Sequence, residues 1–376
     1  MKAGWKIAKL GDVCHVYQPE TLSQKQLKDG PYPVYGANGQ IGFHNEFNHA
    51  EPQLTLGCRG TCGVVNWTTE NAWINGNAMV VKAVEELVIP QFLSYALKGG
   101  INIGDSISGT AQPQITRKSL TPIEIPLPPL AEQKRIVALL DEAFAGIDEA
   151  KAKAEDILER TQALFESHLQ SIFSQQGHGW VERRLGELSR INYGYTESAS
   201  SEKVGPHFLR ITDIQDDGVD WNTVPYCPID KGDLPKYKLI DGDIVFARTG
   251  ATTGKSYLVS NPPDSVFASY LIRVQLSDKA LIPGFLYLFF QTRSYWDVIR
   301  AGVSGSAQGG FNASKLGELT IPYPASLNDQ KAVIHSIAEI QADTLKAGKL
   351  SNRKLQALAE LRESLLTQAF AGELTA

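Results

Sequence analysis

The chain has 376 residues, with 36 basic and 41 acidic side chains and a formal net charge of −5 at pH 7. This length is enough for two or three domains. The net charge argues against a protein that grips nucleic acid unaided through the phosphates, although it leaves room for local basic patches or for a partner that brings positive charge. The four cysteines are too few and too irregular for a disulfide framework, and we expect no metal site.

Neither a signal peptide at residues 1–10 nor an apolar run long enough to cross a membrane is expected. We therefore expect a cytoplasmic protein.

The first part of the chain, Lys2 to about Pro129, predicts a globular body of mixed α+β structure with many short strands. Gly and Asn turns separate the segments that read as strands. The predicted strands lie in 31–42, at 53–56, at 62–65 and at 78–81. A helix is expected at 90–98, where Gly99 and Gly100 stop it.

A long helix follows from Leu130 to about Phe173. Apolar or small residues recur there in steps of four and three, a mean period of 3.5 that is typical of a helix packed along a partner helix. At about 1.5 Å per residue such a rod is on the order of 60 Å long, which favours a spacer over a core element. Its predicted seam positions are Ile136, Leu140, Ala143, Ile147, Ala150, Ala154, Ile157, Thr161, Leu164 and His168.

Residues 175–179 break this helix before a second body, which ends near Pro324. Strands are predicted at 208–211 and 243–247, and an amphipathic helix at 284–301. A second long helix then repeats the first, 197 residues later, with Gln133 matching Gln330 and Phe173 matching Phe370. Its predicted seam positions are Val333, Ile337, Ile340, Thr344, Ala347, Ser351, Leu358, Leu361 and Leu365.

The internal repeat reaches beyond the helices. Residues 4–5 and 10–13 recur at 179–180 and 185–188, and a Ser-Gly-Thr-Ala-Gln segment at 108–112 recurs as Ser-Gly-Ser-Ala-Gln at 304–308. The bodies between these fixed points differ. This pattern suggests a duplication in which each body acquired its own ligand. Each long helix alone could be an ordinary amphipathic core helix, but two at one fixed offset make that interpretation much weaker.

Motifs for catalysis are weak. Residues 250–256 resemble a phosphate-binding loop, but only three residues separate the glycines and a strand rather than a helix is expected next, so a β-hairpin is the better interpretation. Residues 261–264 resemble the Asn-Pro-Pro-aromatic loop of amino-methyltransferases, but Asp264 replaces the aromatic residue. We find no paired carboxylates with a lysine as in a nuclease site. We therefore predict that the chain is not itself an enzyme.

Polar residues on glycine-rich loops suit the reading of DNA bases instead, because Arg, Asn and Gln offer bidentate hydrogen bonds to base edges in the major groove. Taken singly, each is more often a solvated loop residue. The predicted DNA-binding residues are Asn38, Gln40, His44, Arg59 and Thr61 in the first body, and Tyr193, Tyr195, Arg210, Arg248, Thr249, Thr252 and Lys255 in the second.

The whole arrangement resembles the specificity (S) subunit of type I restriction–modification enzymes. The resemblance covers essentially the whole chain and depends on the repeated order of body and long helix together with several segments. These segments are 125–136 (IPLPPLAEQKRI), 185–188 (LGEL), 208–214 (FLRITDI) and 364–374 (SLLTQAFAGEL).

The resemblance implies an α+β fold with two globular target-recognition domains, separated by two long antiparallel coiled-coil helices and related by a pseudo-two-fold repeat. The implied segments are recognition domain 1 (1–129), spacer helix 1 (130–175), recognition domain 2 (176–326) and spacer helix 2 (327–376). Each recognition domain would read one half of a bipartite double-stranded DNA target, while the helices fix the spacer and dock modification subunits.

The resemblance also implies partners: two modification (M) subunits, which carry the methyl donor and catalysis, and restriction (R) subunits with the motor and nuclease. We expect no cofactor on this chain, with methyl donor and ATP on the partners. Two alternatives stay open, a self-contained enzyme and a coiled-coil scaffold that binds only proteins. An irregular stretch at 347–349 also raises the question of whether the second helix is straight.

Overall fold

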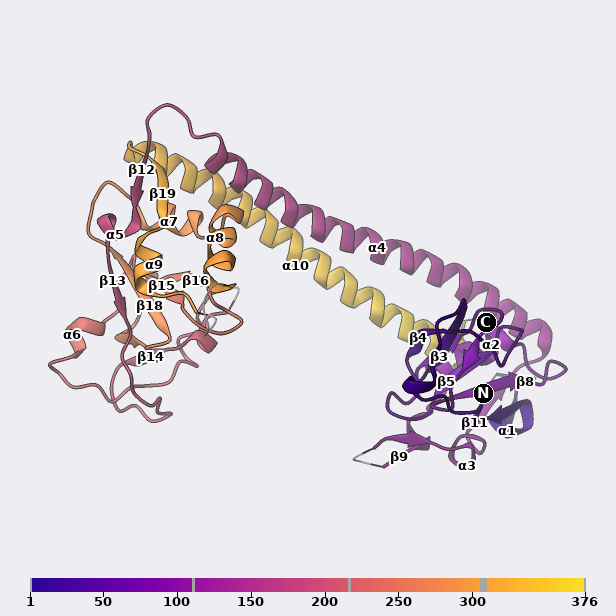
Figure 1. Cartoon of the computed structure of the whole chain (residues 1–376). Helices are drawn as coiled ribbons and strands as arrows, with labels where there is room; N and C mark the ends of the chain where they lie inside the picture. Colours follow the sequence, from indigo (N-terminus) through magenta and orange to yellow (C-terminus); the bar gives the residue numbers. More distant parts are fainter. Residues whose placement is uncertain (1, 110–111, 216–217, 305–309, 375–376) are drawn as a thin grey trace. The chain divides into compact units, whose positions relative to one another are not determined.

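The protein is described here by a computed structural model, which covers residues 2–109, 112–215, 218–304 and 310–374 (Figure 1). By their contacts the residues form two units. Unit one is Met1–Glu155 with Ser351–Ala376, and unit two is Asp156–Leu350. Each unit therefore holds one globular body and one half of each long helix. The four-segment division expected from the sequence remains a prediction.

The two predicted long helices are present and continuous. They are α4 (Leu130–Ser174) and α10 (Leu327–Ala371), each of 45 residues. α10 continues through 347–349 without a break, and in unit two a Cβ atom at Gly348 would lie 3.6 Å from Leu158 on α4. Further along unit two, Phe173 and Ile334 both pack on α7 (Pro283–Phe289). These contacts pair the start of one helix with the end of the other, so the halves run antiparallel.

The helices bury their apolar faces against the bodies as well as against each other. In unit one the core includes Ile136, Leu140, Phe144 and Ile147 of α4 with Leu366, Ala369 and Phe370 of α10. In unit two it includes Phe165, Leu169 and Phe173 with Ile337. Arg362 of α10 also donates to Asp148 of α4 at 2.8 Å in unit one, and its guanidinium lies 4.3 Å from the ring centroid of Phe144.

The predicted seam is displaced in part of the helices. Leu164 is 65% exposed, and Ile157 and Leu361 are also exposed, whereas the neighbouring Phe165 and Leu169 are buried. An α-helix has 3.6 residues per turn, so a strict 3.5-residue pattern drifts by about 20° per heptad across the face of a straight helix. The aromatic side chain of Phe165 is also larger than the side chain of Leu164 and has more apolar surface to bury. The seam expectation was therefore wrong as a packing assignment at these three leucine and isoleucine positions.

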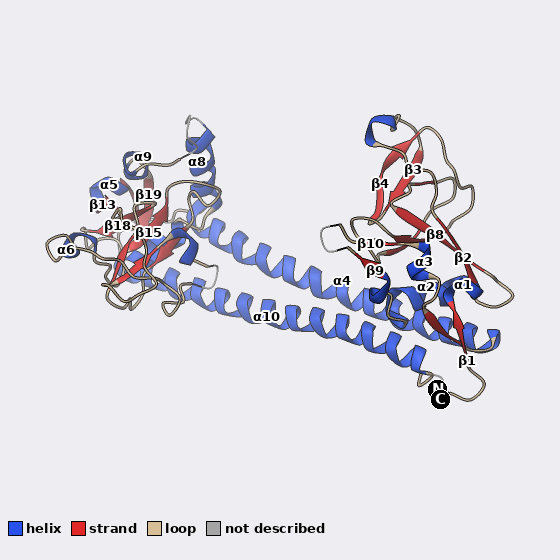
Figure 2. Ribbon diagram, turned by 90° about the horizontal axis from the view of Figure 1, so that it is seen from below, coloured by secondary structure: helices blue, strands red, loops and turns tan. Residues whose placement is uncertain are grey.

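The body of unit one is built on a four-stranded antiparallel sheet of order β2-β8-β5-β6. Figure 2 labels two of these strands, β2 and β8. Its strands are β2 (Cys14–Tyr17), β8 (Ala78–Ala83), β5 (Leu54–Gly57) and β6 (Val65–Trp67). A smaller sheet has the order β4-β3-β7, in which β3 and β7 are parallel. Its strands are β4 (Gly39–His44), β3 (Tyr32–Gly36) and β7 (Trp73–Ile74). The antiparallel pair β1 (Lys6–Lys9) and β11 (Glu124–Leu127), which lies at the two ends of the body in the chain, leads into α4.

The body of unit two repeats this plan. Its four-stranded sheet has the order β13-β18-β15-β16, which places the strands in the same sequence as in unit one. These strands are β13 (Ser189–Tyr193), β18 (Leu271–Leu276), β15 (Ile244–Ala247) and β16 (Ser256–Leu258). A parallel pair, β14 (His207–Leu209) with β17 (Ser265–Phe267), matches β3 with β7. The pair β12 (Trp180–Arg184) and β19 (Thr320–Pro324) leads into α10.

Short helices occupy matching places in the two bodies. In unit one they are α1 (Leu10–Val13), α2 (Pro90–Tyr95) and α3 (Arg117–Leu120). In unit two they are α5 (Leu185–Leu188), α7 and α9 (Ala313–Gly317). Unit two adds α6 (Leu234–Tyr237) and α8 (Arg293–Ser304), and unit one adds the strand pair β9 (Ile107–Ser108) and β10 (Gln114–Ile115). The duplicated α+β architecture expected from the sequence is confirmed.

Four local expectations differ from the structure. The helix predicted at 90–98 is α-helical only as α2 (Pro90–Tyr95) and continues as a π-helix, Ala96–Gly100, through the two glycines expected to stop it. The strand predicted at 62–65 begins only at Val65, because 58–64 forms a turn. The strand predicted at 208–211 ends at Leu209 and continues into a 3-10 turn, Ile211–Asp213. The helix predicted at 284–301 is split into α7 and α8, because Thr292 accepts a hydrogen bond from the backbone N–H of Tyr295 and starts a new helix.

Candidate nucleic-acid interface

Two equivalent turns join the third and fourth strands of the matching sheets, at 58–64 in unit one and 248–255 in unit two. We call them the paired turns. Gly63 N donates to Gly57 O at 2.9 Å in the first, and Gly254 N donates to Ala247 O at 2.9 Å in the second. Gly60 and Gly250 both have a φ of +79°, a backbone conformation that residues with a Cβ atom rarely adopt. The hairpin expected at 250–256 is confirmed, because β15 and β16 pair antiparallel.

Each paired turn lies against the repeated Ser-Gly-containing loop of its own body. Ile115 N donates to Cys58 O, and Phe311 N donates to Arg248 O, both at 2.9 Å. The central residues of these loops, 110–111 and 305–309, lie outside the described residues. The hydrogen bonds make Arg248 the counterpart of Cys58, so the two bodies present different side chains from one frame.

The predicted contacts of unit one gather on two neighbouring loops. Arg59 and Thr61 are exposed on the first paired turn, and Asn38 and Gln40 are exposed at the tip of the β3–β4 hairpin. The hairpin packs on the turn at Gly57, where an added Cβ would lie 2.3 Å from the carbonyl oxygens of both Ala37 and Thr61. Gly57 therefore allows the two loops to approach closely and to form one surface with four polar side chains.

His44 does not belong to that surface. Its side chain is 4% exposed, its Nδ1 accepts a hydrogen bond from Lys28 N at 3.1 Å, and its ring meets Trp73 edge-on with centroids 5.4 Å apart. The sequence placed His44 on a glycine-rich loop, but it ends β4 and points into the body. We therefore remove it from the DNA-contact candidates.

In unit two, Arg248 is held over an aromatic ring. Its guanidinium carbon lies 4.9 Å from the centroid of the Tyr193 ring, and the Tyr193 hydroxyl accepts a hydrogen bond from Ala313 N at 3.1 Å. The cation–π contact and the anchored hydroxyl orient both side chains, while Tyr193 remains exposed. Thr249 forms a backbone bridge to Gly310 beside them. These residues form one cluster.

Two other candidates in unit two are engaged with their own body. Arg210 donates to Asp213 through Nε at 3.0 Å and Nη2 at 2.7 Å, and this hydrogen bonding raises the pKa of Arg210 further. Tyr195 packs on Tyr237 with ring centroids 5.0 Å apart. The ion pair engages the guanidinium edge that a bidentate base contact needs. These two residues are therefore weaker candidates than Arg248.

Thr252 and Lys255 lie on the wall of a cavity of about 1460 Å³ in unit two. The turn, β16, α8 and the unit-two halves of α4 and α10 line it with cationic and aromatic side chains, beside Glu166 and several apolar residues. The cationic and aromatic side chains include Arg293, Trp296, Arg300, Tyr257 and Lys349.

Sequence reasoning missed two amides close to the surface of unit one. Within the described residues, the buried atoms Asn66 Nδ2 and Asn77 Oδ1 have no hydrogen-bond partner. Asn66 lies 3.7 Å from where a Cβ of Gly39 would be, and Asn77 O accepts from the backbone N–H groups of Cys58 and Arg59. Nothing in the spacing of these asparagines marks them out, because strand pairing alone brings them together.

Across the described ranges, no group of three or more His, Cys, Asp or Glu side chains could hold a metal ion. Cys58 and Cys62, four residues apart, instead meet Gln18 Nε2 and Pro113 O respectively. In the part of the chain that the structure describes, no helix is long and apolar enough to cross a bilayer.

Comparisons with known proteins agree with this architecture. The family described as type I restriction modification DNA specificity domain matches residues 2–159 and 177–360, which is one match for each repeat. The EcoKI specificity subunit of Escherichia coli K12 is 27% identical over 78% of this chain and 67% of its own length. The EcoBI specificity subunit of Escherichia coli is 25% identical over 86% of this chain and 74% of its own.

Solved structures share the fold. A chain from a study of complex assembly and conformational transition of the type I R-M system has a TM-score of 0.78, with 18% identity and 99% of both chains covered. The HsdS subunit from Thermoanaerobacter tengcongensis has a TM-score of 0.55, with 18% identity, 100% of this chain and 98% of that chain covered.

Proposed function

The chain belongs to the type I restriction modification DNA specificity family, and from that premise we propose that it is the subunit that selects the DNA target of such a complex. Each body reads one half of a bipartite double-stranded sequence. The two long helices set the unread spacer and dock the modification subunits.

One observation carries this proposal: a single frame is built twice and carries different side chains at its exposed turn. The strand order, the Gly turn at φ +79° and the hydrogen bond to the repeated loop are common to both bodies. In one body the exposed turn carries Arg59 and Thr61 and lies beside the β3–β4 hairpin. In the other body the turn carries Arg248, which lies over Tyr193. A protein with two different half-sites needs this combination of equal scaffolds and unequal surfaces.

The subunit itself performs no catalysis in this proposal. Two modification subunits supply methyl transfer and hold the methyl donor, and restriction subunits supply ATP-driven motion and cleavage, in the cytoplasm. Because the chain has a net charge of −5, the modification subunits supply much of the positive charge that holds the phosphates.

The test replaces residues 2–125 with the corresponding body of a relative and maps methylated bases in DNA from cells that also hold the partner subunits. We expect one half-site to change and the other half-site to stay. The reciprocal exchange of residues 179–321 should change the opposite half. If both halves changed in either exchange, independent reading by the two bodies would be wrong.

A DNA pull-down distinguishes the scaffold alternative. The assembled complex of this chain with modification subunits should retain DNA that contains the mapped target over DNA with scrambled half-sites. Equal retention of both DNAs by the wild-type complex would favour a scaffold that binds only proteins.

A further inference from the structure

One buried amide in unit one links the start of α4 to the body. Gln133 is 0% exposed, although glutamine is usually a surface residue. Its Oε1 accepts a hydrogen bond from Ile89 N at 2.8 Å, and its Nε2 donates to Leu87 O at 3.0 Å and to Pro128 O at 2.9 Å. The side chain thus ties together the first turn of α4, the strand end before it and the segment that begins α2.

Unit two contains the same arrangement at its own helix junction. Gln330 is also 0% exposed. Its Oε1 accepts from Ile282 N at 2.9 Å, and its Nε2 donates to Ala280 O and to Pro324 O, each at 2.7 Å. Every partner corresponds between the units: the isoleucine before α2 or α7, the residue two positions earlier, and the proline before the long helix. We call the two arrangements the glutamine clamps.

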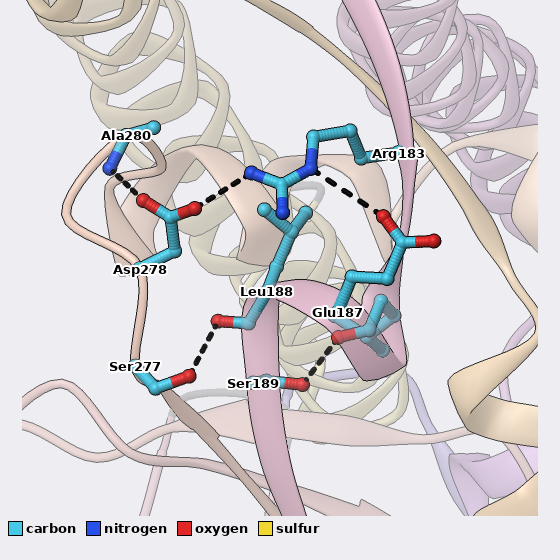
Figure 3. A network of polar contacts seen from close by, with 8 residues as sticks. Arg183, Glu187, Leu188, Ser189, Ser277, Asp278 and Ala280 are labelled. Carbon is cyan, nitrogen blue, oxygen red and sulfur yellow. Dashed lines mark hydrogen bonds and ion pairs between the residues drawn. The ribbon is translucent and has the colours of Figure 1, made fainter.

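A second set of polar contacts holds the clamped segment of unit two (Figure 3). Asp278 accepts from Ala280 N at 2.9 Å and from Arg183 Nη1 at 2.6 Å, and Arg183 Nε reaches Glu187 at 3.5 Å. These hydrogen bonds lower the pKa of Asp278, so the carboxylate stays charged at neutral pH. Ala280 is therefore fixed through its N–H by Asp278 and through its carbonyl by Gln330.

The chemistry of these clamps specifies glutamine. The partners are two carbonyl oxygens and one N–H, so the site requires two donors on one atom and an acceptor on the other. A carboxylate would face two carbonyl oxygens, and an apolar side chain would leave three buried backbone groups without partners. Such unsatisfied groups are costly, so the clamp allows one geometry between body and helix.

We infer that Gln133 and Gln330 are positioning residues that fix the angle at which each recognition body is held on its long helix, and thereby the spacer length that the complex accepts. This inference deepens the proposed function and depends on it. Neither glutamine is inferred to contact DNA. Both act through the orientation of the bodies that carry Arg59 and Arg248.

The experiment compares wild type with Q133M and Q330M in the complex with modification subunits. Methionine keeps the length of the side chain and removes its hydrogen bonds. The matched control is Q356M, at an exposed position on α10. The substrates keep both half-sites and differ in spacer length by one base pair in either direction, and methylation is measured on each.

We expect the preference for the native spacer to fall about tenfold in Q133M and Q330M, the change that follows from a lost geometric preference of roughly 1.4 kcal/mol. The recognised half-site bases should remain unchanged. A general loss of stability would not selectively change the spacer preference in this way. Q356M should keep the wild-type preference. Folded Q133M and Q330M complexes with the wild-type spacer preference would overturn the inference.

A second variant covers the case in which Q133M does not assemble. In Q133E a protonated carboxyl keeps the acceptor for Ile89 N and can donate to one of the two carbonyl oxygens, so the spacer preference should fall relative to wild type, but by less than tenfold. An unchanged preference in Q133E would count equally against the inference.

A measurement without DNA separates this inference from the proposed function. Spin labels are attached to the full chain through Lys118→Cys, on α3, and Glu142→Cys, on α4. Cys62→Ser removes the native cysteine that is not buried. The distance distribution between the labels should broaden in Q133E and remain narrow in Q356M. If the wild-type complex ignored bipartite targets while this broadening was seen, the proposed function would fail and only the clamp would stand. A narrow distribution in Q133E would refute the clamp itself.

Discussion

Arg248 lies over the ring of Tyr193, with its guanidinium carbon 4.9 Å from the ring centroid. The two residues come from β13 and from the end of β15, which both pair with the intervening strand β18. The Tyr193 hydroxyl is fixed in turn by Ala313 N. A guanidinium oriented in this way loses less conformational freedom when it binds a planar base edge than a free surface arginine would.

The first prediction concerns Arg248 and Arg59, the arginines on the two paired turns, which stand at neighbouring rather than equivalent positions. Substitution of either residue by Ala should cost about 1–3 kcal/mol of specific binding by the assembled methyltransferase, because a bidentate contact to a base edge is lost. Each substitution should relax selection in one half-site only. Titration with cognate DNA and with DNA mismatched in one half-site measures both effects.

Exposed arginines elsewhere in the same bodies serve as controls. Arg190→Ala on β13 and Arg117→Ala on α3 should leave the discrimination between cognate and mismatched DNA unchanged. If R248A bound cognate DNA as tightly as wild type, Arg248 would be removed from the contact residues, and the same holds for Arg59.

The second prediction concerns the buried thiols. Burial raises the pKa of Cys14 to about 12 and that of Cys227 to about 11, from a usual value of 9.0. In the native chain at pH 8 both thiols should resist alkylation, while the half-buried Cys62 reacts, as peptide mass mapping can show.

The same pKa shifts make stability depend on alkaline pH. A raised native pKa means that the unfolded state ionises first, so the stabilisation is complete below about pH 9 and is lost as the pH rises toward the native values. The urea midpoint of wild type should therefore fall between pH 8 and 10 by more than that of Cys14→Ala. Equal slopes in the two proteins would contradict the assignment.

The third prediction concerns the contact between the end of α10 and the first body. Phe370 packs against Phe92 with ring centroids 4.8 Å apart, and a Cβ at Gly100 would lie 2.3 Å from the Phe370 ring. Gly100→Ala should therefore destabilise the chain by about 1–3 kcal/mol through overpacking, measured by urea unfolding.

Gly146 on α4 is the matched control, because an added Cβ there would meet nothing within 4 Å. Gly146→Ala should stabilise the helix by about 1 kcal/mol, since glycine is unfavourable in helix interiors. A Gly100→Ala variant as stable as wild type would show that the C-terminal end of α10 adapts freely on the body.

The architecture was predictable because it is carried by periodicity and repetition. Both long helices and the duplicated body could be inferred from spacing alone, since a 3.5-residue pattern and a fixed offset of 197 residues are properties of the sequence. The displacement of the seam to Phe165 and Leu169 was not predictable. It depends on which side chains of the helix face become buried when the whole face packs in the fold.

The candidate site was predictable only in part. Arg59 and Arg248 were found because glycines mark their turns, and those turns proved equivalent. His44 was assigned wrongly because composition cannot tell an exposed polar side chain from one that points into the core. The match of Gln133 with Gln330 was visible, but their role depends on partners 44 to 50 residues away in the chain that only the fold brings close.

The last prediction treats the long helices as the measure of the spacer. One heptad is inserted beside Ala154 in α4 and another beside Ser351 in α10, both buried positions. A heptad keeps the packing phase and adds about 10.5 Å of helix. Because B-DNA rises about 3.4 Å per base pair, the preferred spacer should lengthen by about three base pairs. Mapping of methylated sites in cells measures the new spacer.

Twist opposes this lengthening. Each added base pair turns the second half-site by about 34°, so three turn it by roughly 100° about the DNA axis. The inserted heptads turn the bodies much less, so total activity should fall even as the preferred spacing moves. Insertion of a heptad in α4 alone is the control, since it puts the two helices out of register and should abolish specific modification. An active double-insertion variant that kept the original spacer would show that the helices do not measure the distance between half-sites.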